Sequence, residues 1–474
     1  MDHYDLVVIG GGSAGLTGAR LAARLGAQTL LAESGRLGGD CLWTGCVPSK
    51  SLLHVAAQMR AARDAGRYGM VIEEGPADLG AAMASVRQAI GAIEPHDSAR
   101  ELAAAGVEVA AGRARFTGPR TLDVAGRAVG FRYALIATGS TPALPSVAGI
   151  ASARDGEPLT TDSIWDLEKL PGRLVVIGGG SAGCELGQAF TRLGSQVTIT
   201  EAADRLLPQE EERASELLRD RLAGEGVTVL TGTPAERVEN GVLHVGGREI
   251  AYDRLLVATG RAPRTTGLGL DKAGVAVDGA GYVTVDGRLR TTHPRVYAAG
   301  DVTRAQSFTH LAGVQAAAAV LNALLGARRR VNYAAIPWVT FTDPEVARVG
   351  LTYEEARRRY GERSRERTLG HDYVDRAVAE DRAEGFTRLV FGPRGRLAGA
   401  TVVAPRAGET IAELAGAVRT GGTARDLAAT VHPYPTYADG PWMAALAEVD
   451  RQLTTPRARR LISVVTGARR TIWR

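Results

Sequence analysis

A chain of 474 residues, 45% hydrophobic and 23% charged, is long enough to form about two to four domains with substantial cores. Its 57 basic residues, only three of them lysines, are scattered among 52 acidic ones, so the formal charge of +5 reflects compositional bias rather than a nucleic-acid surface. Three cysteines are too few for a structural disulfide framework. The start lacks a basic segment before its apolar run, and no stretch of about 18 apolar residues occurs, so we expect a cytoplasmic protein without a membrane span.

One glycine-rich pattern occurs twice along the chain. "DLVVIGGGSAG" and "RLVVIGGGSAG" each predict a short apolar strand, a glycine turn and a helix, followed by a second strand that ends at Glu33 or Glu201. The glycines are Gly10, Gly12 and Gly15 in the first copy and Gly178, Gly180 and Gly183 in the second. In both copies the acid lies 23 positions after the first glycine (33 − 10 and 201 − 178). This spacing predicts two Rossmann βαβ units, each with a pyrophosphate at a helix N-terminus and a ribose diol on the acid.

Two of the three cysteines lie between the copies, in "CLWTGCVPSK". Cys41 and Cys46 are five positions apart and Lys50 follows them, a pattern that indicates redox chemistry or metal binding rather than packing. The third, Cys184, lies in the predicted helix of the second unit, where we interpret it as a small buried apolar residue.

Several stretches together resemble the FAD-dependent pyridine nucleotide–disulfide oxidoreductases. They are "GGDCLWTGCVPSK", "LIATGSTP", "GCELGQAF", "LLVATGRAP", "VYAAGDVT" and "IPWVTFTDPEVARVG". The resemblance implies an α/β fold with two Rossmann-like dinucleotide-binding domains and a C-terminal α/β dimerisation domain, in a homodimer with active sites at the interface. The expected boundaries are 1–148 with 270–326 for FAD, 149–269 for NAD(H), and 327–474 for the interface domain.

The same resemblance implies a role for each residue of the cysteine segment. Cys46 is expected to face the flavin as the charge-transfer thiol, and Cys41 to be the interchange thiol that meets substrate. Lys50 is expected to lower the thiol pKa and to pair with Glu185, and Gly45 to let the two sulfurs meet. Electrons would pass from NADH to FAD, then to the Cys41–Cys46 disulfide, then to an acceptor.

Further cofactor contacts transfer by motif. Those expected on the FAD side are Gly39, Lys50, Ala114, Thr138, Gly139, Ser140 and Asp301, and Gly260 is expected on the NAD side. We assign no metal ligands. Because Glu201 would repel a 2′-phosphate, we expect NADH to be preferred over NADPH, although Arg205 lies close by in the sequence.

The segment "HPYPTYAD" departs from relatives that process dithiols, which carry a histidine base oriented by a glutamate. Here Tyr434 holds the base position and Asp439 the acid position, with His432 two positions before the tyrosine. A neutral phenol is a poor proton acceptor, which disfavours an ordinary dihydrolipoamide dehydrogenase, and whether His432 substitutes is open. Mercuric reductases share the tyrosine, but the cysteine pair at their end has no counterpart in "RRTIWR".

Three functions therefore stay open. The first is an NADH-dependent reductase of a disulfide, or a dithiol oxidase in reverse. The second is a reductase of metal ions or quinones, and the third a flavin redox sensor without turnover. Ser181 replaces an aromatic residue found near the nicotinamide in many relatives. We interpret the basic segment "TTPRARRLISVVTGARRTIWR" as a solvated C-terminal extension of unknown role, with an amphipathic helix for an anionic lipid or a partner as the alternative.

Overall fold

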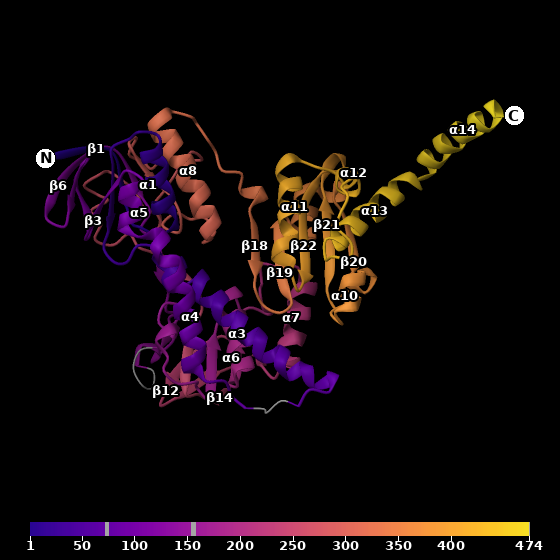
Figure 1. Ribbon diagram of the computed structural model, residues 1–474, viewed down its shortest axis with the longest axis horizontal. Coiled ribbons are helices and arrows are strands. Elements are labelled where there is room, and N and C mark those ends of the chain that lie inside the picture. The colour runs from indigo at the N-terminus through magenta and orange to yellow at the C-terminus, as the bar shows by residue number, and fades with distance from the viewer. Residues whose placement is uncertain (72–74, 153–157, 474) are drawn as a thin grey trace. The chain divides into compact units, whose positions relative to one another are not determined.

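The computed structural model describes residues 1–71, 75–152 and 158–473 (Figure 1). The chain forms two compact units, one of residues 1–204 with 222–331 and one of 205–221 with 332–474. Both combine helices and strands, so the α/β fold class predicted from the sequence is confirmed.

The first unit contains a seven-stranded sheet with the order β3-β2-β1-β6-β5-β4, and β17 pairs with β6. Strands β3, β2, β1, β6 and β17 run parallel, whereas β4 and β5 form antiparallel pairs. The bounds are β1 Asp2–Ile9, β2 Thr29–Glu33, β3 Val107–Ala111, β4 Ala114–Gly118, β5 Thr121–Val124, β6 Arg127–Ile136 and β17 Val296–Ala298. The apolar run of β1 is buried at its carboxyl end, as expected for a strand covered on both faces.

Helices α1 and α8 pack together against this sheet, and small side chains such as Ala19 and Ala316 are fully buried where they meet. The helices of this part are α1 Ser13–Arg24, α2 Gly39–Trp43, α3 Cys46–Asp64, α4 Leu79–Ile93, α5 Ala99–Ala104 and α8 Thr309–Leu325. Helix α1 connects β1 to β2 and completes the first predicted βαβ unit.

A five-stranded parallel sheet, with the order β11-β10-β9-β15-β8, contains the second βαβ unit. Its elements are β8 Leu159–Thr160, β9 Arg173–Ile177, α6 Ser181–Leu193, β10 Gln196–Thr200, β11 Thr228–Leu230 and β15 Arg254–Val257. A three-stranded antiparallel sheet and a two-stranded sheet accompany it. Their strands are β12 Ala235–Glu239, β13 Val242–Val245, β14 Arg248–Ala251, β7 Ser140–Pro142 and β16 Arg261–Pro263.

The second unit is built on a five-stranded antiparallel sheet with the order β18-β19-β22-β21-β20. The strands are β18 Pro337–Thr340, β19 Glu345–Gly350, β20 Arg365–Gly370, β21 Phe386–Phe391 and β22 Leu397–Ala404. The helices are α7 Glu212–Gly224, which crosses the boundary at residue 221, α9 Tyr353–Tyr360, α10 Asp375–Ala379, α11 Ala407–Thr420, α12 Ala424–Ala428, α13 Asp439–Leu453 and α14 Pro456–Ile472.

A buried ion pair joins residues 205–221 to this second sheet. Arg348 Nε on β19 lies 3.0 Å from Glu210 Oε2, and both side chains are almost completely buried. The Trp338 ring on β18 covers the guanidinium, and its indole N–H donates to Glu210. These contacts explain why residues 205–221, which lie within the predicted 149–269 domain, belong to the same compact unit as residues 332–474.

Candidate functional site

The two glycine turns have matching backbone conformations. Gly10 and Gly178 follow their strands with φ of +105° and +113°, a region that favours glycine. A Cβ atom on Gly15 would lie 1.8 Å from the Gly10 carbonyl oxygen, and one on Gly183 would lie 1.9 Å from that of Gly178. Each turn therefore packs its helix directly onto the preceding strand.

The amide groups at the start of both helices have no side-chain cap. Helix α1 begins after Gly12 and α6 after Gly180, and neither first turn contains an acidic residue. Uncapped N–H groups and the positive end of the helix dipole favour an anion such as a pyrophosphate.

The acid at the end of each second strand makes the same two contacts. Glu33 accepts a hydrogen bond from the Gly11 N–H at 2.5 Å, and Glu201 accepts one from the Gly179 N–H at 2.6 Å. Each also accepts from the amide two residues further along, Gly35 in the first copy and Ala203 in the second. The two copies of the sequence repeat therefore make the same hydrogen bonds. These bonds hold each carboxylate beside its glycine turn.

A cavity of about 1080 Å³ opens at the carboxyl ends of β1 and β2 in the first unit. Its lining brings together many residues predicted from the sequence to serve FAD or the redox step. These are Gly10, Gly12, Glu33, Gly39, Cys41, Cys46, Ala114, Thr138, Gly139 and Asp301. The position matches the rule that ligands of open α/β sheets bind beyond the carboxyl ends of the strands.

Both cysteines of the pair are free thiols on the wall of this cavity. Cys46 is the first residue of α3, and its Sγ lies 3.1 Å from Thr309 Oγ1 on α8. A Cβ atom on Gly45 would lie 2.9 Å from the Asp40 carbonyl oxygen and 3.4 Å from Cys41 Cα, so the two cysteine segments approach closely only with glycine there.

The two thiols have pKa values shifted in opposite directions. The hydrogen bond from Cys41 lowers the pKa of Cys46 to about 6; the Thr309 hydroxyl and the Lys50 charge act in the same direction, against burial. The hydrogen bond to Cys46, followed by burial, raises the pKa of Cys41 well above its ordinary value. At neutral pH the pair therefore holds its negative charge on Cys46 and its proton on Cys41.

Lys50 lies one turn after Cys46 on α3. Its Nζ is 2.8 Å from Glu185 Oε2 on α6, a nearly buried carboxylate. This ion pair holds the ammonium group between the cysteine helix and the helix of the second glycine motif.

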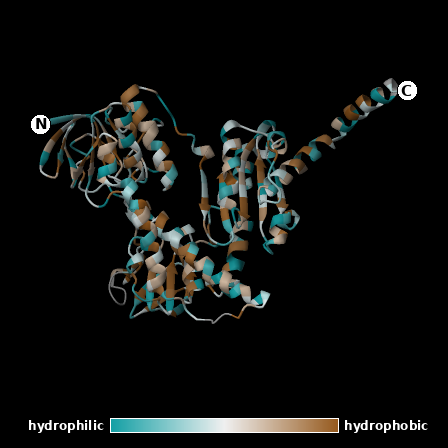
Figure 2. Ribbon diagram, in the orientation of Figure 1, coloured by the Kyte–Doolittle hydropathy of each residue, from teal (hydrophilic) through white to brown (hydrophobic). Residues whose placement is uncertain are grey.

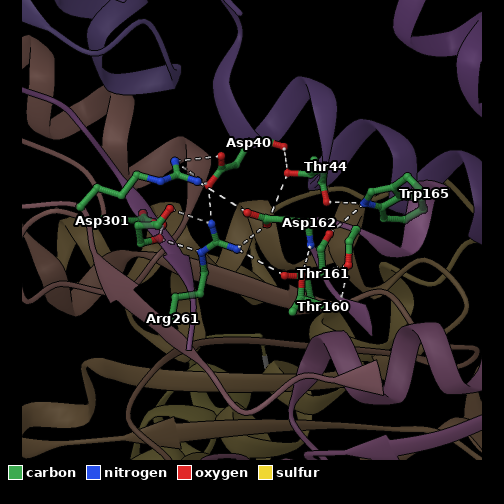
Figure 3. A network of polar contacts seen from close by, with 11 residues as sticks. Asp40, Thr44, Thr160, Thr161, Asp162, Trp165, Arg261 and Asp301 are labelled. Carbon is green, nitrogen blue, oxygen red and sulfur yellow. Dashed lines mark hydrogen bonds and ion pairs between the residues drawn. The ribbon is translucent and has the colours of Figure 1, made fainter. Parts of the chain in front are cut away.

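A network of two arginines and two aspartates borders the cysteine segment (Figure 3). Arg261 on β16 pairs with Asp40, the residue before Cys41, and lies 3.3 Å from Asp162 Oδ1. Arg264 contacts the same two carboxylates at 3.1 and 3.5 Å. Opposite charges alternate in the network, so the negative charge beside Cys41 is compensated locally.

This network continues to Asp301 through one serine. Arg261 Nε donates to Ser140 Oγ at 2.7 Å, and Ser140 Oγ donates to Asp301 Oδ2 at 2.8 Å. Near the cysteines, the Trp165 indole N–H donates to the Thr44 carbonyl at 2.9 Å (Figure 3). Asp40, Asp162, Arg261 and Arg264 were not predicted as site residues, although the charged residues in "GGDC" and "GRAPR" were visible in the sequence.

Other predicted residues lie outside this cavity lining. Gly15 packs against the first glycine turn, Ser140 bonds to Asp301 of the lining, and Lys50 pairs with Glu185. Five further predicted residues lie at the glycine turn of the second βαβ unit and at its neighbouring strand ends, within the unit formed by residues 1–204 and 222–331. They are Gly178, Gly180, Gly183, Glu201 and Gly260.

The segment around Tyr434 belongs to the second unit. The Tyr434 hydroxyl is exposed and donates to Asp375 Oδ2 at 2.5 Å, and this hydrogen bond raises the pKa of Tyr434. Asp439 begins α13 and accepts from the Thr436 N–H at 3.2 Å. The residue placed against the tyrosine hydroxyl is therefore Asp375, which the sequence did not single out.

His432 has oxygen acceptors at both ring nitrogens. Nε2 lies 2.8 Å from Glu413 Oε2, and Nδ1 lies 3.0 Å from the Thr430 carbonyl. Within the residues described, no cluster of three or more histidine, cysteine or acidic side chains is arranged to hold a metal ion, and no helix is long and apolar enough to cross a membrane.

Comparisons with known proteins agree with this arrangement. Residues 4–319 match the family described as pyridine nucleotide-disulphide oxidoreductase, and residues 336–445 match its dimerisation domain. A dihydrolipoyl dehydrogenase of Thermus scotoductus is 40% identical over 94% of this chain and 98% of its own length. A mercuric reductase of Streptomyces lividans is 36% identical over 93% and 95%. 

Two solved structures are also similar. LpdA of Mycobacterium tuberculosis has a TM-score of 0.85 at 28% identity. The match covers 94% of this chain and 100% of LpdA. A Cu(II) complex of the HOCl-induced flavoprotein disulfide reductase RclA of Escherichia coli has a TM-score of 0.84 at 27% identity, with the same coverage.

The fold and the site define the class of dinucleotide-dependent redox enzymes, here with two free thiols on the wall of the cavity. The chain belongs to the pyridine nucleotide-disulphide oxidoreductase family, as the sequence resemblance implied. It is a flavoprotein oxidoreductase; the family depends on FAD and takes electrons from NAD(P)H, and the dimerisation domain supports a homodimer.

The cavity residues fit FAD. The uncapped start of α1 suits a pyrophosphate, and Glu33 beside it can accept hydrogen bonds from a ribose diol. The cysteine pair and Asp301 line the same cavity. The cysteines would serve as the redox partner of a bound flavin, and Asp301 as a further hydrogen-bonding carboxylate.

Proposed function

We propose that this protein passes electrons from NADH through FAD to the Cys41–Cys46 disulfide, and from the dithiol to a disulfide substrate in the cytoplasm. Bound FAD would supply the step between hydride transfer and thiol chemistry. Cys41 would exchange with the substrate disulfide, while Cys46 holds the thiolate toward the cofactor. The observation that carries the proposal is the opposite pKa shift of the two thiols on one cavity wall.

A second candidate is a reductase of metal ions. It is favoured by Tyr434, which replaces a histidine base and donates its proton to Asp375 in a hydrogen bond. A phenol whose pKa is raised cannot easily accept a proton from an incoming dithiol near neutral pH. Similarity to mercuric reductases and to the Cu(II) complex of RclA agrees with this alternative.

An acceptor panel separates the candidates. The holoenzyme is reduced anaerobically with one equivalent of NADH and mixed with lipoamide, glutathione disulfide, Hg(II), Cu(II) or a quinone. We expect a disulfide to reoxidise the enzyme fastest. Cys41→Ser should abolish this reaction, whereas Cys184→Ala, a change at a buried cysteine, should preserve it. Rapid reoxidation by a metal ion, with every disulfide inactive, would reject the first candidate in favour of the second.

We expect Glu201→Arg to shift cofactor preference from NADH toward NADPH. In the wild type the Glu201 carboxylate, held by the Gly179 N–H, repels a 2′-phosphate, whereas an arginine would pair with it. The ratio of kcat/KM for NADPH to that for NADH should rise at least about tenfold. Glu249→Arg, the same charge change at an exposed position, is the control. Wild-type kcat/KM with NADPH equal to that with NADH would contradict the cofactor assignment.

We expect Tyr434→Phe to leave flavin reduction by NADH unchanged and to slow acceptor turnover about fivefold, the usual effect of removing one hydrogen bond. The segment around Tyr434 is proposed to meet the acceptor across the homodimer. Because no histidine base acts in this proposal, the wild-type pH profile should lack a rise with a pKa near 6 to 7. 

Two further variants test the same residue. Tyr434→His should increase dihydrolipoamide oxidation if a base is the missing element, and Asp375→Asn should reproduce part of the Tyr434→Phe effect. Strong wild-type dihydrolipoamide oxidation that survives Tyr434→Phe but is lost in His432→Ala would identify His432 as the base instead.

A further inference from the structure

Helix α14, Pro456–Ile472, carries five arginines and no acidic residue. They are Arg457, Arg459, Arg460, Arg469 and Arg470. Every residue from 459 to 470 is exposed, and in the described part of the chain no carboxylate pairs with any of the five. The helix therefore presents positive charge that its own unit does not compensate.

The same helix presents exposed apolar side chains at helical spacing. Leu461, Val464, Val465 and Ala468 lie along one side of the helix, and Arg457 of the first turn lies on that side as well. Arg459, Ser463 and Arg470 lie on the opposite side, and Arg460 and Arg469 border the apolar side. Leu461 and Val464 are 67% and 68% exposed, which is unusual for residues arranged in a stripe. Figure 2 shows hydrophobic and hydrophilic residues interspersed along α14, and Trp473 beyond it is 90% exposed.

We propose that α14 binds the surface of an anionic lipid bilayer, with its axis in the plane of the membrane interface. The apolar face would enter the boundary between headgroups and acyl chains, and the guanidinium groups would pair with lipid phosphates. One partner would then bind both the apolar side chains and the arginines of the helix. The helix would lie on the membrane rather than cross it, because it is neither long nor apolar enough to span one.

Two other occupants explain fewer of these features. Pairing of α14 with the same helix of a second copy would cover the apolar face, but it would bring together arginines with no acid on either helix. A nucleic acid would meet the arginines but would leave the apolar stripe in water. Of these three occupants, the bilayer matches both the charge and the apolar stripe, and this proposal does not depend on which electron acceptor the enzyme uses.

The experiment is co-sedimentation of the full-length holoenzyme with vesicles of phosphatidylcholine alone, or of phosphatidylcholine with phosphatidylglycerol. We expect binding only to the anionic vesicles, with binding lost between about 0.1 M and about 1 M salt. The triple variant R459Q/R460Q/R470Q should bind at least about tenfold more weakly. The matched control is R100Q/R304Q/R358Q, which removes the same charge from three other exposed arginines.

A second set of variants tests the apolar face. Leu461→Ser with Val464→Ser should weaken binding to anionic vesicles without changing the number of arginines. The fluorescence of Trp473, obtained as the difference between wild type and Trp473→Phe, should move to shorter wavelength when vesicles are added. Rates of flavin reduction by NADH should be equal in all variants, which verifies their folding.

Three results would overturn the proposal. The first is equal binding to neutral and anionic vesicles, and the second is equal loss of binding in the control variant. The third is a lower subunit number for R459Q/R460Q/R470Q in the absence of lipid, with no vesicle binding by the wild type. That outcome would assign α14 to contact between copies of this chain.

Discussion

Replacing Cys46 by serine abolishes the long-wavelength absorbance that we expect when the FAD-loaded enzyme is reduced by two electrons. That absorbance requires a thiolate in contact with the flavin. Cys46 is the thiol whose pKa is lowered, to about 6, so it supplies the thiolate at neutral pH, whereas the pKa of Cys41 is raised. Cys41→Ser cannot form the disulfide, so it should show the band before NADH is added and lose it when NADH reduces the flavin, whereas Cys184→Ala should behave like the wild type. Anaerobic NADH titration with absorbance spectra measures all three.

The same band should depend on pH. In the wild type we expect its loss on acidification with a midpoint near pH 6, where the Cys46 thiolate takes up a proton. Lys50→Met removes a positive charge that stabilises the thiolate, so the midpoint should rise by about one unit. A wild-type band that persists unchanged well below pH 6, or a Lys50→Met midpoint equal to that of the wild type, would show that the thiolate is stabilised by another group.

We expect the largest effect on stability from Arg348→Met. This substitution leaves Glu210 buried without its charge partner, and removing one partner of a buried ion pair costs about 3–5 kcal/mol. Urea unfolding of the holoenzyme, followed by far-UV circular dichroism, measures the change. Arg358→Met, at an exposed position on α9, should change the free energy of unfolding by less than about 0.5 kcal/mol.

The pH dependence of this variant follows from the remaining carboxylate. Burial raises the pKa of Glu210 already in the wild type, and loss of Arg348 removes the charge that opposes this shift. A raised carboxyl pKa in the folded state favours folding below the unfolded pKa, about 4.3, and this contribution is lost as pH rises. The deficit of Arg348→Met should therefore be small near pH 4 and grow toward pH 8.

A double variant tests the cause of the deficit. Arg348→Met with Glu210→Leu replaces the pair by apolar side chains, and it should recover most of the lost stability. If the double variant is as unstable as the single one, then packing against Trp338, rather than the unpaired charge, causes the loss.

The sequence predicted those parts of the site that depend on local spacing. Gly10 and Glu33 lie within one βαβ unit, so a contact between its glycine turn and its acid follows from a short-range pattern. Cys41 and Cys46 are separated by a single turn at Gly45, and their proximity follows in the same way.

Contacts between distant segments could not be predicted from local spacing, and the one that was expected, Lys50 with Glu185, came from the family resemblance. The network of Asp40, Asp162 and Arg261 joins three segments that are each about one hundred positions or more apart, and a charged residue on a loop does not specify its partner. The ion pair of Glu210 and Arg348, separated by 138 positions (348 − 210), was unpredictable for the same reason. It binds residues 205–221 to the second unit. Asp375 was unpredictable as the partner of Tyr434 for this reason as well.

Glu33 and Glu201 each accept hydrogen bonds from two loop amides in the same arrangement, so the two βαβ units offer an adenosine ribose an equivalent carboxylate. FAD and NADH carry the same adenosine at that end. The cysteine pair lines the cavity beside the first βαβ unit, so this cavity offers a contact beyond the adenosine end by which the two dinucleotides can be distinguished. We expect a fragment made of adenosine and phosphates alone to meet an equivalent carboxylate at either βαβ unit, so its ribose should contribute little to a choice between the two sites.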